Sequence, residues 1–124
     1  PDEVMRLASG APIAPRETDA PIAIGDTVIP AGSTVLVVLG AANRDPRMFD
    51  NPDTFDLERT KGRPIAFGQG IHTCLGAAVA RLETKVALQA LLEVAPEYDV
   101  VESELVRNQL VPTRGVAHAP IVFG

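Results

Sequence analysis

The 124 residues suffice for one domain with a modest core, and a composition of 46% hydrophobic and 22% charged residues is typical of a globular protein. The net charge of −5, with acidic and basic residues mixed and no basic tract, argues against a nucleic-acid-binding protein. The single cysteine excludes an intrachain disulfide and fits a reducing, cytoplasmic compartment, and no apolar run approaches the roughly 20 residues that a membrane-spanning helix needs.

The first segment, Pro1 to Ala8, is predicted to be the end of a helix that stops at Ser9-Gly10. Because the chain opens inside this helix and without a Met, we expect a fragment of a longer protein. Glu3 and Arg6 lie three residues apart and therefore share a helix face. On this spacing alone, the simplest interpretation is an exposed ion pair, worth at most about 1 kcal/mol.

The region most typical of β structure runs from Pro21 to Leu39, after an irregular segment from Gly10 to Pro15. Ile22 and Ile24 alternate with Ala23, Gly25-Asp26 supplies a turn and Val28-Ile29 leads the chain back, which predicts a hairpin. Pro30-Ala31-Gly32 predicts a second turn. The nearly continuous apolar run from Ser33 to Leu39 predicts a strand covered on both faces.

The second half begins with a polar loop from Asp50 to Pro64. Leu75 to Glu93 then shows the clearest helical periodicity, with a broad apolar stripe and one narrow polar line, which predicts a helix packed inside a larger body. Strands are predicted at Tyr98–Val101 and Val116–Phe123, with Val106–Val111 pairing back.

The segment that organises the chain is Phe67 to Gly76, which carries the only cysteine, Cys74, directly before the long helix. Unpaired N–H groups and the positive dipole end at a helix start favour the ionised form of a thiol. Gly68, Gly70 and Gly76 allow backbone conformations that a Cβ forbids, or the close approach of a flat group. One thiolate in a glycine-lined loop suits a large planar metal cofactor, and haem iron can be held by one axial Cys thiolate.

A lone cysteine is more often a small buried hydrophobe, so the neighbouring residues decide the interpretation. The spacing Phe67-x-x-Gly70-x-x-x-Cys74-x-Gly76, with His72 two residues before the cysteine, closely resembles the cysteine loop of bacterial cytochrome P450 monooxygenases. The resemblance extends from Glu3 to the end of the chain. It implies an α+β fragment of the mostly α cytochrome P450 fold, with β hairpins, an irregular meander and a Cys loop that leads into a long core helix.

The resemblance further implies that residues 1–124 are the C-terminal haem-binding portion of such an enzyme, with the oxygen-activating helix and most of the substrate pocket upstream. The cofactor would be haem b, iron protoporphyrin IX, with Cys74 as the axial ligand of its iron. The matching cofactor-binding positions are Arg16, Phe67, Gly68, His72, Cys74 and Gly76. Arg16 and His72 would bind the propionates, and Phe67 would pack over the proximal side of the ring.

The same resemblance assigns Glu3 and Arg6 to a buried ion pair that braces the segment before the Cys loop. In the family, a third partner comes from a Pro-x-Arg-Phe element. Here the matching residues are Pro52-Asp53-Thr54-Phe55, and Thr54 replaces the expected Arg or His. The sequence therefore leaves open whether the pair has a third partner, and it does not place the nearby Arg59.

The implied activity of the intact protein is O2-dependent hydroxylation of a small organic substrate, with electrons from a ferredoxin or a flavodoxin-like donor. Lys61 and Arg81 match positions at which family members meet this donor, although solvated surface charges are an equally good interpretation. The substrate segments would be Gly10–Pro15 and a turn at Leu110–Pro112. The alternative hypothesis is a truncated or stand-alone fragment without monooxygenase activity, haem-free or acting as an interaction module, which self-associates through exposed apolar faces.

Overall fold

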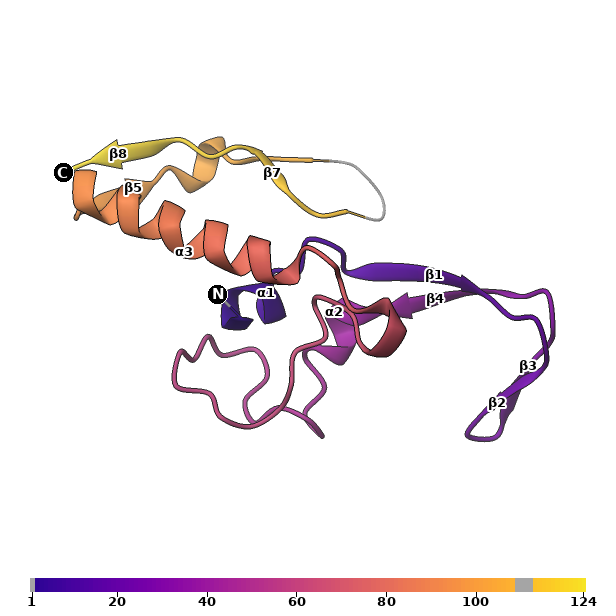
Figure 1. The fold of residues 1–124 in the computed structure, drawn as a ribbon. Helices are drawn as coiled ribbons and strands as arrows, with labels where there is room; N and C mark the ends of the chain where they lie inside the picture. The colour runs from indigo at the N-terminus through magenta and orange to yellow at the C-terminus, as the bar shows by residue number, and fades with distance from the viewer. Residues whose placement is uncertain (1, 109–112) are drawn as a thin grey trace.

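The computed structural model describes residues 2–108 and 113–124 as a mixed α+β arrangement with one long helix and several short hairpins (Figure 1). The predicted turn at Leu110–Pro112 and the end of the strand predicted at Val106–Val111 lie outside the described residues. The helices, 3-10 turns and strands are, in chain order, α1 (Asp2–Leu7), β1 (Ile13–Glu17), β2 (Ile22–Ile24), β3 (Thr27–Ile29), β4 (Thr34–Val38), α2 (Leu39–Ala42), η1 (Gly70–His72), α3 (Ala77–Val94), β5 (Tyr98–Val100), η2 (Glu102–Glu104), β6 (Val106–Arg107), β7 (Val116–His118) and β8 (Ile121–Phe123).

The strands form small antiparallel pairs rather than one large sheet: β1 with β4, β2 with β3, β5 with β8, and β6 with β7. The predicted hairpin around Gly25-Asp26 is confirmed as β2–β3, and it lies at the far end of an arm formed by β1 and β4 (Figure 1). Strand β1 falls partly in the segment predicted to be irregular, and it places Arg16 opposite Val35 on β4.

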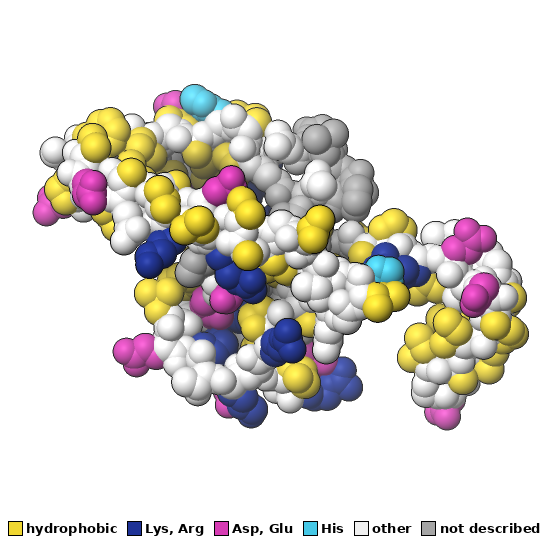
Figure 2. Space-filling model, viewed as in Figure 1, with side chains coloured by type: hydrophobic (Ala, Val, Ile, Leu, Met, Phe, Trp, Pro, Cys, Tyr) yellow, Lys and Arg dark blue, Asp and Glu magenta, His cyan; other side chains and the backbone are white. Residues whose placement is uncertain are grey.

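The prediction that Ser33–Leu39 is covered on both faces is wrong for this chain. The strand exists as β4, but within the described residues its one partner strand is β1, and Leu36 and Val38 remain exposed. An apolar β-branched run indicates a strand, whereas its covering depends on tertiary partners that the run does not specify. Hydrophobic side chains consequently reach the surface along this arm and along α3 (Figure 2).

The predicted long helix is confirmed as α3, which begins two residues later than expected because Cys74 to Gly76 form a turn before it. It ends where Pro96 cannot continue the hydrogen-bond ladder, and the N–H of Ala95 makes the last bond, to the carbonyl of Leu91. Its apolar stripe, expected inside a larger body, is exposed in this structure at Val79, Leu82 and Val86.

The C-terminal tail is more finely divided than predicted. The expected final strand, Val116–Phe123, is split into β7 and β8. β8 pairs with β5, whereas β6 pairs with β7, so the segment that begins at Val106 does not pair back onto Tyr98–Val101. The N–H of Val101 donates instead to the carbonyl of Pro120, at 3.0 Å.

The best-buried part of the chain contains polar side chains as well as an aromatic ring. The largest fully buried side chains are Arg6, Phe49 and Asn43. The Arg6 guanidinium lies over the Phe49 ring, with Cζ 5.1 Å from the ring centroid. Gly62, at φ +88°, packs so closely that an added Cβ would lie 2.5 Å from the Phe49 ring. The long polar loop is thereby held against the first helix.

We therefore expect Gly62→Ala to lower the free energy of unfolding by about 2–4 kcal/mol, because it combines a positive φ with a direct clash against Phe49. Gly32→Ala is the matched control, since Gly32 also has a positive φ (+73°) but nothing within 4 Å of the added Cβ. The control should cost about 1 kcal/mol. Urea-unfolding midpoints compare the two variants, and equal losses would refute the close packing.

Candidate functional site

A cavity of about 430 Å³ lies between α1, the β1–β4 arm and the Cys loop. Most of its wall is apolar, and the apolar residues include Met5 on α1 and Val37 on β4. The lining residues are Met5, Gly10, Ala11, Ala14, Arg16, Val37, Leu39, Ile65, Ala66, Phe67, Gly68, Gln69, His72 and Cys74. Segments from the first third of the chain and from the Cys loop therefore meet around one space.

Five of the predicted cofactor residues line this cavity: Arg16, Phe67, Gly68, His72 and Cys74. The sixth, Gly76, lies beside it rather than in its wall. Gly76 has an ordinary φ of −83°, and an added Cβ would meet only Cys74 Sγ, at 3.9 Å. A side chain at position 76 would therefore enter the space next to the sulfur.

The Cys loop is closed by main-chain hydrogen bonds that leave its sulfur exposed. The N–H of Cys74 donates to the carbonyl of Phe67 at 2.7 Å, and the N–H of Gly68 donates to the carbonyl of Ile65 at 2.8 Å. Gly68 has φ +74°, and a Cβ there would lie 2.4 Å from the carbonyl oxygen of His72. Only glycine fits this position without moving the loop.

The start of α3 leaves main-chain donors next to the cysteine. The carbonyl of Cys74 accepts from the N–H of Ala77 at 3.2 Å, which closes the turn into the helix. Among the described residues, the N–H groups of Leu75 and Gly76 donate to no backbone carbonyl. They are the free donors expected at a helix N-terminus, and they immediately follow the thiol in sequence.

The remaining polar side chains of the wall are a guanidinium, an imidazole and an amide. Arg16 is exposed on β1 and donates to the carbonyl of Pro15 at 2.8 Å. His72 is exposed in η1. The cavity thus combines the thiol of Cys74, an apolar wall and two side chains that can bind carboxylates.

On α1, which contributes Met5 to the cavity, Glu3 and Arg6 form a nearly fully buried bidentate ion pair, with N–O distances of 2.7 Å and 2.7 Å. The question of a third partner is answered by Arg59, whose Nε donates to Glu3 Oε1 at 3.2 Å. The side chain of Thr54 makes no such contact among the described residues, but its carbonyl accepts from both guanidinium groups. The arginine that the motif lacks is supplied five residues later.

This cluster binds the polar loop to α1. Arg6 Nη1 donates to the carbonyls of Asn43 and Pro52, at 2.9 and 2.5 Å. The hydrogen bond from Arg6, aided by those from the Asp56 N–H and from Arg59, lowers the pKa of Glu3 from 4.5 to about 2. The hydrogen bond to Glu3 in turn raises the pKa of Arg6. Both groups are therefore charged throughout the physiological range.

Asn43 is a buried residue that the sequence did not single out. Its Oδ1 accepts from the N–H of Ile65 at 2.8 Å, while its carbonyl accepts from Arg6. Ile65 lines the cavity and its carbonyl accepts from Gly68, so Asn43 connects the buried cluster to the Cys loop. Neither periodicity nor a motif in the sequence predicts this role for Asn43, because the role depends on a partner 22 residues away.

The two basic residues considered for partner binding are each paired with a carboxylate. Lys61 Nζ lies 2.7 Å from Asp50 Oδ1, and Arg81 Nε lies 2.8 Å from Asp2 Oδ1. Both side chains remain substantially exposed.

Residues 2–108 and 113–124 contain no group of three or more His, Cys, Asp or Glu side chains arranged to hold a metal ion. In the same part of the chain, no helix is both long and apolar enough to cross a membrane.

Comparison with known proteins decides the family. The family profile described as Cytochrome P450 matches residues 2–104. The chain belongs to the cytochrome P450 family. Two similar relatives are the putative cytochrome P450 123 of Mycobacterium tuberculosis, 40% identical over 97% of this chain, and the cytochrome P450 monooxygenase PikC of Streptomyces venezuelae, 48% identical over 82% of this chain.

The fold is that of the corresponding part of solved cytochrome P450 structures. P450BioI, in complex with an acyl carrier protein ligated to hexadec-9Z-enoic acid, superposes with a TM-score of 0.92 at 36% identity over 99% of this chain. The chain spans 32% of that structure and 30% and 25% of the two relatives. Members of the cytochrome P450 family bind haem b.

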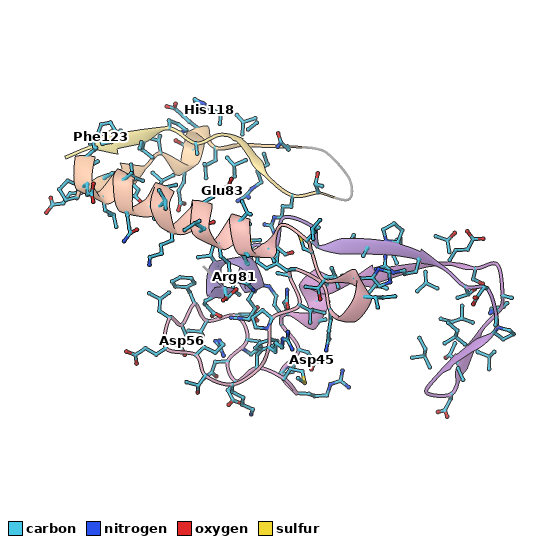
Figure 3. The ribbon with its side chains drawn as sticks, in the orientation of Figure 1. Asp45, Asp56, Arg81, Glu83, His118 and Phe123 are labelled. Atoms are coloured by element: carbon cyan, nitrogen blue, oxygen red, sulfur yellow. The ribbon has the colours of Figure 1, made fainter. Side chains whose placement is uncertain are left out.

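We expect the buried cluster to make stability depend on pH between about 4.5 and 2. Because the pKa of Glu3 falls from 4.5 to about 2 on folding, its stabilisation is complete above pH 4.5 and is lost as the pH falls towards 2. Glu3→Gln should be less stable at pH 7 and should lose less stability on acidification. Denaturant titrations at several pH values measure this, with Glu83→Gln, at an exposed carboxylate of α3 (Figure 3), as the control that keeps the wild-type slope.

We expect Asn43→Ala to leave the N–H of Ile65 without its acceptor, at a cost of about 1–3 kcal/mol. Hydrogen exchange at the Ile65 amide should accelerate more than exchange at amides within α3. If Ile65 exchanges at the same rate in both proteins, Asn43 does not hold the start of the Cys loop.

Proposed function

We propose that residues 1–124 form the C-terminal haem-binding portion of a haem-thiolate monooxygenase. The observation that carries this proposal is the exposed Cys74 sulfur in the wall of an apolar cavity that also presents Arg16 and His72. The intact protein would insert one oxygen atom of O2 into a small organic substrate and reduce the other to water with two electrons from a donor.

The residues present fit haem b in three respects. The macrocycle is a flat apolar body, and the cavity wall is mainly apolar. Its iron takes one axial protein ligand, and Cys74 is the exposed sulfur donor. Next to that sulfur, Gly76 leaves a space that a Cβ would fill, which allows the close approach of a ring.

The main chain of the loop would fix the ligand atom. The hydrogen bond from Cys74 N–H to Phe67 O holds the cysteine backbone, and the free N–H groups of Leu75 and Gly76 are available to donate to the sulfur. Such donors tune the electron density of a thiolate. Haem bound through a thiolate supplies dioxygen activation, because the thiolate favours O–O cleavage.

The other side chains would orient the cofactor. Arg16 and His72 would bind its two propionates, for which a guanidinium fork and an imidazole N–H are suitable donors. Phe67 would pack over the proximal side and exclude water from the sulfur. Glu3, Arg6 and Arg59 would act at a distance, by fixing the loop that precedes Ile65.

The segment Gly10–Pro15 would border the substrate, and Gly10, Ala11 and Ala14 already line the cavity. These small apolar residues favour an apolar substrate. The electron donor would be a ferredoxin or a flavodoxin-like protein, attracted by basic groups that include Lys61 and Arg81. A cytoplasmic location suits such a soluble redox chain.

The decisive experiment is a spectrum of the protein reconstituted with haemin, reduced, and exposed to carbon monoxide. We expect the strongly red-shifted band of thiolate ligation, and we expect Cys74→Ala to abolish it. Arg16→Gln and His72→Ala should weaken haemin binding but keep the position of the band, because neither side chain is the ligand. A band that survives Cys74→Ala would refute the proposal.

A second candidate function is an interaction module without haem. It is favoured by the exposed apolar stripe of α3, which includes Val79, Leu82 and Val86 (Figure 2). Such a surface supports self-association. The same spectrum separates the two functions, because a haem-free module gives no thiolate band under any condition.

A further inference from the structure

Arg81 joins three elements of the structure at one point. Its guanidinium lies over the ring of Phe67, with Cζ 4.7 Å from the centroid. Its Nε also donates to Asp2 Oδ1 at 2.8 Å. Figure 3 shows Arg81 reaching from α3 towards α1, and the Cys loop supplies the aromatic partner.

We propose that Arg81 is a positioning residue that fixes the Phe67 ring in the wall of the cysteine cavity. The inference rests on the proposed function, since it concerns how the Cys loop is held for its cofactor. It gives Arg81 a role inside the protein, in addition to any contribution to the binding of an electron donor.

The contact is of the kind that a guanidinium makes best. Arginine is planar and weakly hydrated, so it can stack on an aromatic face while its nitrogen atoms still donate to a carboxylate. A separation of 4.7 Å lies within the roughly 6 Å over which a cation and a ring attract each other. Asp2 sets the direction from which the guanidinium approaches the ring.

Fixing Phe67 also affects the cysteine through the main chain. The carbonyl of Phe67 accepts the hydrogen bond from Cys74 N–H. The residue that carries the ring and the residue that carries the sulfur are therefore joined by one main-chain hydrogen bond. Phe67 is only half-buried, and a ring held on one side by Arg81 has fewer rotamers available. The cavity wall therefore depends on a residue that does not line the cavity.

The ion pair alone does not account for Arg81. Both its side chain and that of Asp2 are about half exposed, and exposed ion pairs contribute little and are screened by salt. Lys85, one turn further along α3, carries the same charge but makes no ion pair within the described residues. It is a matched control for the loss of one positive charge from this helix.

The test is a double-mutant cycle on Arg81→Gln and Phe67→Leu, with haemin affinity as one readout and fluorine NMR as the other. The chain has four phenylalanines, so 4-fluorophenylalanine gives four resonances, and the Phe67 signal is the one lost in Phe67→Leu. We expect Arg81→Gln to shift and broaden this resonance and to weaken haemin binding about two- to fivefold. It should have no further effect in the Phe67→Leu background.

The controls separate positioning from charge and from folding. Lys85→Gln should leave the Phe67 resonance and haemin affinity close to those of the parent, and Arg81→Lys should restore only part of the affinity. An unchanged Phe49 resonance shows that each variant is folded.

An Arg81→Gln effect that persists undiminished in Phe67→Leu, or that Lys85→Gln reproduces, would overturn the inference. If the parent protein binds no haemin, the proposed function fails. The Phe67 resonance in Arg81→Gln then decides the inference by itself.

Discussion

The buried contact among Glu3, Arg6 and Arg59 is the constraint on which the rest of the structure depends. Burying three charges is costly unless every one is paired and hydrogen-bonded, and here two guanidinium groups share one carboxylate while their remaining donors bind main-chain carbonyls of the polar loop. Breaking the contact would leave a charge unpaired in the interior. The polar loop is therefore most stable in the one conformation that keeps this contact with α1. A segment without regular secondary structure thereby acquires a fixed conformation.

A short series of hydrogen bonds connects this buried contact to the loop that carries the cysteine. Arg6 binds the carbonyl of Asn43, whose side chain binds Ile65, whose carbonyl binds the N–H of Gly68. The Cys loop is therefore held at its beginning by Asn43 and at its end by the first turn of α3. Between these points, the positive φ of Gly68 and the hydrogen bond between Phe67 and Cys74 determine where the sulfur lies.

Local signals in the sequence were sufficient for α3, for the β2–β3 hairpin and for the Cys loop, because periodicity, turn residues and fixed spacing are properties of neighbouring residues. Strand β1 was missed because Pro15, Arg16 and Glu17 do not alternate in hydrophobicity. Arg59 and Asn43 could not be placed, since their partners are distant in the chain. The exposure of Leu36 and Leu82 was also unpredictable, because apolar runs specify an element but not what covers it.

The wall of the cavity is drawn from segments far apart in the chain, with Arg16 on the β1–β4 arm and Cys74 beyond the polar loop. Contacts between such distant residues form late in folding, because the entropy of closing the intervening loop is lost before the contact contributes stability. A peptide that contains the Cys loop alone would therefore keep the thiol but not the pocket. During synthesis, the β1–β4 arm leaves the ribosome before the Cys loop does, so its share of the cavity wall is exposed to solvent until the Cys loop has been made.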